Sequence, residues 1–166
     1  KAYYSDYGKM PAPPGNDGKM RNGNTDFDFG GKWINYGQSQ NKVIEILRGS
    51  NAIYNGISYN PNKTVYLDVP ISSMEGDDYA GSDYNVNDGY FLDPWGTPYQ
   101  ICMDTDFDGV TKFSLLRTPP FTADKGWNDI EIKGQKVCVV SYGPPPNALQ
   151  DVLCSWGGNA AKENPP

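Results

Sequence analysis

The feature that most constrains the fold of this chain lies between residues 91 and 109, where a rigid turn, an apolar run and an acidic loop follow one another without a break. The turn consists of Asp93, Pro94, Trp95 and Gly96. Its proline fixes its own φ and disfavours helical backbone at the residue before it, while the glycine can adopt a positive φ. The apolar run that follows, Tyr99–Asp104, predicts a strand. We therefore expect β-structure, not helix, in this part of the chain.

Alternate aspartates follow the predicted strand and are closed by a glycine, in the order Asp104, Asp106, Asp108 and Gly109. They match the first half of an EF-hand loop, and such a loop can supply part of the roughly six to eight oxygens that calcium takes. The remainder departs from that motif, because Lys112 stands at the ninth position and Leu115, instead of a bidentate Glu, at the twelfth. Hydrogen bonds from side chain to backbone would also make the same residues a metal-free turn. A weak calcium site and a plain turn both remain open.

Composition narrows the class of protein. The chain has 166 residues, including 19 glycines and 14 prolines, which is typical of a loop-rich globular domain and not of a helical bundle. A net charge of −6 argues against nucleic acid as a partner, since binding the phosphate backbone needs a basic face. No apolar run approaches the ~18 residues that a membrane span needs. The chain also lacks an initiating Met and a signal peptide, so we expect a natural N-terminus upstream.

The first part of the chain is expected to be helical, with long loops. Residues 1–9 are interpreted as the end of a helix that a cluster of prolines then stops. Residues 41–48 carry an apolar stripe typical of an amphipathic helix, and Gly49 offers a C-terminal stop. The segments 12–32 and 72–90 are polar and lack periodicity, so both are predicted to be surface loops.

The remainder of the pattern predicts strands. Alternation over residues 64–69 places three apolar side chains on one face, namely Val65, Leu67 and Val69. Three further strands are expected over Tyr99–Asp104, Thr111–Arg117 and Ile130–Tyr142. The last is expected to break at Gly134, and the Asp-rich turn would join the first two as a hairpin. The result is a single α+β domain over residues 1–166, with a frayed tail at about 157–166.

The three cysteines allow at most one internal disulfide and leave one thiol over. A bridge between Cys138 and Cys154 would tie the last strand to the C-terminal loop. A bridge between Cys102 and Cys138, on neighbouring strands, is the main competitor, and three reduced thiols are the third option. The chain contains no histidine, so neither a catalytic cysteine nor a Cys/His zinc site is expected.

Other enzyme signatures are missing from the sequence. Its carboxylates lie in loops without the spacing of a catalytic pair, and it has neither a serine-nucleophile elbow nor a phosphate-binding glycine loop. The tryptophans Trp95, Trp127 and Trp156 would suit a sugar-stacking platform, but such aromatics more often fill a small core or a subunit contact. We therefore expect a protein that is not an enzyme.

Four segments in the same order resemble one family, the major pseudopilins of type II secretion systems. They are Ala2–Pro11, Asp93–Tyr99, Val139–Gly143 and Asp151–Trp156. The first is similar to the exit of the long N-terminal helix of that family, and the second to its central Asp-Pro-Trp-Gly signature. The calcium-binding C-terminal loop of the family is replaced here by a proline-rich sequence, in which only Asp151 matches an acidic ligand position.

The resemblance implies a pilin-like head, in which a remnant of the N-terminal helix packs on a small antiparallel β-sheet. It also implies an upstream apolar helix that anchors the subunit in the inner membrane and leaves this part periplasmic. The function implied is structural, namely homotypic assembly into a short filament that supports protein export. The partners implied are other pseudopilin subunits and the secretion machinery.

Two rival functions remain open. One is a secreted calcium- or carbohydrate-binding module that uses the acidic loops and the aromatic residues. The other is a subunit of a type IV pilus, which shares the anchoring helix but serves adhesion or uptake. The sequence upstream of Lys1 separates the first rival from a pseudopilin, because a pseudopilin needs an apolar segment of about 20 residues there.

Overall fold

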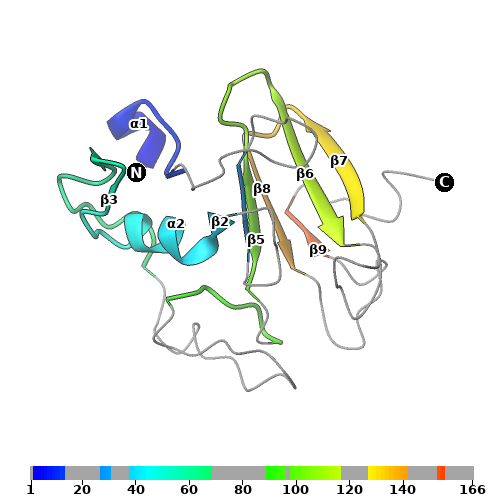
Figure 1. Ribbon diagram of the computed structural model, residues 1–166, viewed down its shortest axis with the longest axis horizontal. Helices are drawn as coiled ribbons and strands as arrows, with labels where there is room; N and C mark the ends of the chain where they lie inside the picture. Colours follow the sequence, from blue (N-terminus) through cyan, green and yellow to red (C-terminus); the bar gives the residue numbers. More distant parts are fainter. Residues whose placement is uncertain are drawn as a thin grey trace.

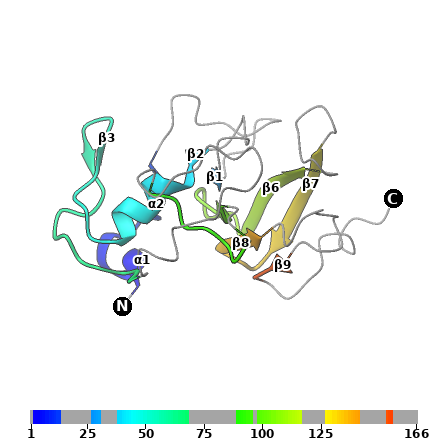
Figure 2. The ribbon, with the colours of Figure 1, turned by 90° about the horizontal axis from the view of Figure 1, so that it is seen from below.

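The computed structural model describes residues 2–13, 27–30, 38–68, 89–95, 98–116, 127–141 and 153–155. Within them the fold is a mixed α+β arrangement of two short helices, a five-stranded sheet and two separate hairpins. The sheet occupies the middle of the molecule, with helix α2 on one side and the β6–β7 hairpin on the other (Figures 1 and 2). The predicted α+β class is confirmed at this level.

The central sheet has the strand order β2-β1-β5-β8-β9. Its members are β1 (Phe27–Gly30), β2 (Gln38–Ser39), β5 (Gln100–Met103), β8 (Val137–Ser141) and β9 (Leu153–Cys154). The β1–β2 pair is parallel and the other three pairs are antiparallel. The first and last described strands of the chain therefore belong to one sheet built from distant segments.

Helix α2 (Gln40–Leu47) confirms the helix predicted at 41–48 and covers the sheet. Val43 and Ile44 on its apolar stripe pack against Ile101 and Met103 of β5. The turn after the helix contains Gly49, whose φ is +92° and whose absent Cβ would lie 3.0 Å from the carbonyl oxygen of Lys63. Glycine is required there both by the positive φ and by this close approach.

Helix α1 (Tyr3–Tyr7) confirms that the first residues are helical, and it stops at Gly8 in the left-handed conformation. That it is the end of a longer helix stays a prediction. Its buried residue, Tyr3, packs with Ile46, Ala52 and Tyr59. These contacts are with α2 and the segment that follows it, and the packing of this helix on the sheet stays a prediction. No helix among the described residues is long and apolar enough to cross a membrane.

A short hairpin of β3 (Ile53–Tyr54) and β4 (Ile57–Ser58) follows α2. Its turn is Asn55-Gly56, and both residues have positive φ, +50° and +76°, as a type I′ turn requires. The prediction of a strand at 64–69 is wrong over its described residues, 64–68, where the backbone is irregular. The amides of Tyr66 and Leu67 instead both donate to the carbonyl of Leu47, at 2.8 and 3.0 Å, so this segment closes onto the end of α2.

The strands β5, β6 (Val110–Leu116), β7 (Trp127–Lys133) and β8 confirm the strands predicted in the second half. The predicted break at Gly134 is also confirmed, with a φ of +77°. The predicted hairpin between the first two strands is wrong. Strand β5 pairs with β1 and β8, whereas β6 pairs with β7 in a separate hairpin. The acidic loop is therefore a crossing from one sheet to another.

Two of the predicted loops are only partly covered by the described residues. The segment 12–32 contains β1, so the prediction of a loop is wrong over Phe27–Gly30. Of the segment 72–90, only residues 89 and 90 are described, and Tyr90 is buried. The tail predicted to fray, 157–166, lies outside the described part of the chain.

Candidate metal centre

Asp104 is the anchor of the acidic loop and is almost fully buried. Its backbone amide donates to the carbonyl of Lys136 at 3.0 Å, which continues the β5–β8 pairing by one more residue. Its side chain is 1% exposed. The Oδ2 atom accepts a hydrogen bond from the amide of Gly109 at 3.2 Å, whereas Oδ1 is buried without a hydrogen-bond partner. A carboxylate oxygen in that position is expensive to keep unless a cation or a donor reaches it.

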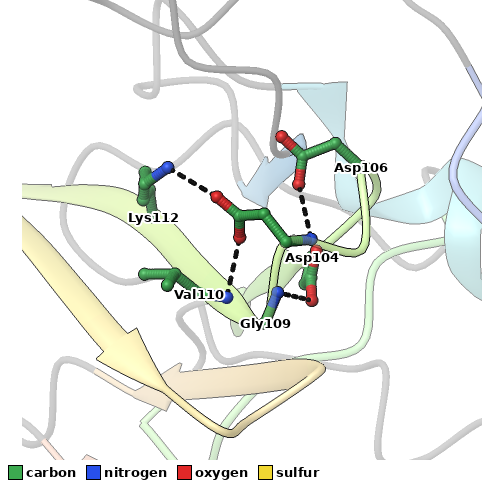
Figure 3. A network of polar contacts seen from close by, with 6 residues as sticks. Asp104, Asp106, Gly109, Val110 and Lys112 are labelled. Carbon is green, nitrogen blue, oxygen red and sulfur yellow. Dashed lines mark hydrogen bonds and ion pairs between the residues drawn. The ribbon is translucent and has the colours of Figure 1, made fainter.

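The rest of the loop is held by its own side chains (Figure 3). Asp106 Oδ1 accepts from the amide of Asp108 at 3.2 Å, and Asp108 Oδ1 accepts from the amide of Val110 at 2.7 Å. The ammonium of Lys112 lies 3.0 Å from Asp108 Oδ2. The two bonds to backbone amides are of the kind that the sequence predicted for a metal-free turn.

The three aspartates are nevertheless close enough to share an ion. One carboxylate oxygen from each of Asp104, Asp106 and Asp108 lies within 4.8 Å of the others. The cluster could therefore hold a metal ion. Its donors are carboxylates alone, which suit a hard cation and not the softer metals that prefer cysteine or histidine. The buried, unpartnered oxygen of Asp104 agrees with such a role.

A basic residue contacts the cluster, and the fourth predicted ligand is not among the described residues. Lys112 places its positive charge on a candidate ligand, Asp108, and so competes with a metal for that carboxylate. Asp151, which the family resemblance added to the ligand set, lies outside the described residues. The structure thus brings together three of the four predicted ligands.

The acidic loop also touches helix α1, a contact that the sequence did not predict. The ring of Phe107, at the tip of the loop with a φ of +61°, lies 5.6 Å from the ring of Tyr4. The ammonium of Lys136 lies 5.2 Å from the centre of the same tyrosine ring. The candidate metal loop therefore supports the outer side of α1.

The Asp-Pro-Trp turn is fixed to the sheet by the side chain of its first residue. Asp93 is 5% exposed, and its Oδ1 accepts from the amide of Trp95 at 3.0 Å. Its Oδ2 accepts from the hydroxyl of Ser141 at 2.6 Å, at the end of β8. Pro94 is exposed, Trp95 is half-buried, and Gly96 lies outside the described residues. The described part of this motif has a structural role.

Gln40 is a second anchor of the same turn that the sequence did not reveal. Its Nε2 donates to the carbonyls of Phe91 and Tyr99, both at 2.9 Å. Its Oε1 accepts from the amide of Phe91 at 2.7 Å. One fully buried amide at the start of α2 therefore holds both arms of the turn. The pKa of the Tyr99 phenol is raised mainly by burial, and the negative charge of Asp93 adds to the effect.

The three cysteines lie on successive strands of the central sheet, β5, β8 and β9. Cys102 and Cys138 are directly opposite each other in the β5–β8 ladder, and both are buried as thiols. Cys154 lies opposite Val140 in the β8–β9 ladder. Of the two predicted bridges, Cys102–Cys138 has the direct register, and the Cys138–Cys154 bridge stays a prediction.

The tryptophans predicted as an alternative sugar platform are covered only in part. Trp95 is half-buried beside its turn, and Trp127 begins β7. Trp156 lies outside the described residues, so the platform as a unit stays a prediction.

Comparisons with protein-family models, curated proteins and solved structures found no match to this chain.

Proposed function

We propose that this chain is the extracytoplasmic head of a pilin-like filament subunit of the type II secretion kind. In this proposal the subunit has no catalytic role. It adds to a short filament through contacts with other copies, which generate an open helical assembly when head-to-tail surfaces do not close on themselves. Its partners are other subunits and the export machinery, and it is held at the inner membrane by a helix N-terminal to Lys1.

The observation that carries the proposal is the docking of α1. A helix of five residues is too short to be stable on its own, and its N-cap residue, Ala2, makes no side-chain cap hydrogen bond. It is nevertheless attached to the head from both sides, by Tyr3 in the core and by Tyr4 against the acidic loop. Such an attachment suits the point at which a long assembly helix enters a globular head.

The central turn supports the same proposal. Its resemblance to the family signature falls on residues with defined contacts, because Asp93 binds Ser141 and the arms of the turn are held by Gln40. The Val139–Gly143 segment, which also resembles the family, contains that same serine. Two of the four matching segments are therefore in direct contact through their described residues.

We further propose that the ion of the Asp104–Asp106–Asp108 cluster is calcium. Calcium accepts irregular sets of carboxylate, carbonyl and water oxygens, whereas magnesium demands a stricter octahedral arrangement. The affinity should be weak, in the range of ~10⁻⁴–10⁻³ M, because Lys112 competes for one ligand and extracellular modules bind in that range. A bound ion would hold Phe107 against Tyr4 and so stiffen the attachment of α1.

The filament proposal is tested by the native N-terminus. Protein purified from its own cells is analysed by intact mass and by mapping of its N-terminal peptide. We expect a processed, N-methylated end followed by an apolar helix that leads into Lys1. A natural N-terminus near Lys1, on protein released into the medium, would refute the filament subunit.

That second outcome would favour the other candidate, a secreted calcium-binding module. The observation on its side is the unpartnered Oδ1 of Asp104, which suits an ion whether or not a filament exists. Calcium binding therefore does not choose between the two functions, but the N-terminal peptide does.

A further inference from the structure

We infer that Cys102 and Cys138 are a disulfide site, which closes across the β5–β8 ladder when the chain folds in an oxidising environment. The first support is register. The two cysteines are Cα partners at the middle of the ladder. The residues two positions further along, Asp104 and Lys136, share a backbone hydrogen bond at 3.0 Å. Because bonded pairs alternate along antiparallel strands, Cys102 and Cys138 form a bonded pair, with a Cα separation of about 5.5 Å.

That separation suits a disulfide. Bridged cysteines usually have Cα atoms roughly 4.4–6.8 Å apart, and opposed residues of a ladder project their Cβ atoms to the same face. A bridge also needs Cβ atoms roughly 3.5–4.5 Å apart, and a bonded pair holds them near about 5.5 Å, so closure must draw the two Cβ atoms together by about 1 Å. Cys154 has no such relation to Cys138, because it is paired with Val140. The backbone therefore favours one pairing among the three that the sequence allows.

Burial gives the second support. Both thiols are 0% exposed, and they lie on the face of β5 opposite to Ile101 and Met103, which pack on α2. Strand alternation places them on the side covered by the β6–β7 hairpin (Figure 1). An oxidant cannot reach them there, so the bridge must form before the hairpin closes over the sheet. Once formed, it is shielded from reducing agents by the same packing.

The chemistry is thiol–disulfide exchange with a small disulfide or a protein disulfide as oxidant. The thiolate of one cysteine attacks the oxidant, breaks its S–S bond and expels one thiolate. The second cysteine thiolate attacks the mixed disulfide and expels the other thiolate. The two protons lost by Cys102 and Cys138 are taken up by the two leaving thiolates. The protein dithiol is oxidised and the oxidant is reduced by the same two electrons.

The inference is independent of the filament proposal, so its test uses the purified chain. The full chain is refolded in reduced and oxidised glutathione, remaining thiols are alkylated, and the unreduced protein is digested for mass spectrometry. Trypsin alone leaves Cys138 and Cys154 on one peptide, since no Lys or Arg lies between Lys136 and Lys162. A second protease that cuts after Tyr142 separates them.

We expect a Cys102–Cys138 cross-linked peptide with Cys154 alkylated. Cys154→Ser should keep this product, and Cys102→Ser should abolish it and leave Cys138 alkylated. In Cys154→Ser, reduction should raise the unfolding equilibrium constant roughly a hundredfold or more, because the bridge restricts the unfolded chain. A Cys138–Cys154 peptide, or three alkylated cysteines in folded protein, would overturn the inference.

Discussion

Two deeply buried polar side chains differ in how completely their hydrogen-bonding atoms are used. Asn60 is 0% exposed, and its Nδ2 donates to the carbonyls of Ile46 and Thr64, both at 2.8 Å. Its Oδ1 accepts from the amide of Thr64 at 3.0 Å and from the hydroxyl of Tyr7 at 2.8 Å. Asp104 is equally buried and carries a charge, yet one of its oxygens has no partner.

The difference separates a residue that builds the fold from one that is suited to a ligand. Buried polar groups in folded proteins are almost always satisfied, because an unmade hydrogen bond is costly. Asn60 and Gln40 follow this rule and join segments that are distant in sequence. Asp104 departs from it within a cluster of carboxylates, which is where a cation would compensate the charge.

The largest expected effect comes from breaking the satisfied site. Asn60→Ala should lower the free energy of unfolding by about 3 kcal/mol or more, because the Tyr7 hydroxyl, the Thr64 amide and two carbonyls lose a buried partner. Urea unfolding measures the change. The control is Asn62→Ala, an exposed position nearby that should have almost no effect. Equal effects at the two positions would contradict the role of Asn60.

Substitution at the unsatisfied residue, Asp104, should have the opposite effect on stability. Without calcium, Asp104→Asn should leave stability unchanged or raise it, since an uncompensated buried charge is removed. In 10 mM calcium the natural chain should gain about 1.4 kcal/mol if its dissociation constant is about 1 mM, and the variant should gain nothing. Urea unfolding with and without calcium checks both statements. Asp68→Asn, on an exposed carboxylate outside the cluster, should behave like the natural chain.

Alkaline pH should lower the stability of the folded protein through Tyr3, whose hydroxyl is hydrogen-bonded to the residue before Asn60. The hydroxyl of Tyr3 donates to the carbonyl of Tyr59, and burial, followed by neighbouring tyrosines, raises the pKa of Tyr3 well above its ordinary value of 10.0. The folded state therefore favours the neutral phenol, and this stability is complete below pH 10 and lost above it. Between pH 9 and 11 the free energy of unfolding should fall by on the order of 1 kcal/mol. Tyr3→Phe should make this slope shallower, because other buried tyrosines with raised pKa values still contribute to it, and an unchanged slope would contradict the assignment.

The smallest effect should come from the competing cation in the acidic loop. Lys112→Gln removes the ammonium from Asp108, so calcium affinity should rise roughly two- to fivefold, while stability without calcium changes by less than about 1 kcal/mol. Calorimetric titration measures the affinity. Lys133→Gln, at an exposed position on β7, is the matched control for the loss of one positive charge. Equal gains in both variants would mean that general charge, not the Asp108 contact, sets the affinity.

The sequence predicted the local elements of this fold better than their partners. The stripe over 41–48 and the strands from Tyr99 onward follow from side-chain periodicity, which is local. The pairing of β5 with β8 across the β6–β7 hairpin depends on which faces become buried together, and no local pattern encodes it. Strand β1 lies in a glycine-rich segment and could not be predicted from local sequence either, because it forms by pairing with β5. The β3–β4 hairpin does have a local signal in the sequence, Asn55-Gly56, a pair that favours a type I′ turn.

The candidate metal site, like the fold, could be predicted from the sequence only in its local features. The alternation of Asp104, Asp106 and Asp108 is visible in the sequence, and their convergence follows from a tight loop. The burial of Asp104 and its unpartnered oxygen depend on the pairing with Lys136, which is non-local. Gln40 and Asn60 were missed because a polar amide in a sequence is normally expected at the surface.

The most direct test of the contrast between Asn60 and Asp104 is calorimetric titration of calcium into the full chain and into Asp104→Asn. We predict binding to the natural chain with a dissociation constant of ~10⁻⁴–10⁻³ M, and no binding heat for the variant. A flat titration of the natural chain at millimolar calcium, or unchanged binding by the variant, would contradict the role given to the buried carboxylate of Asp104.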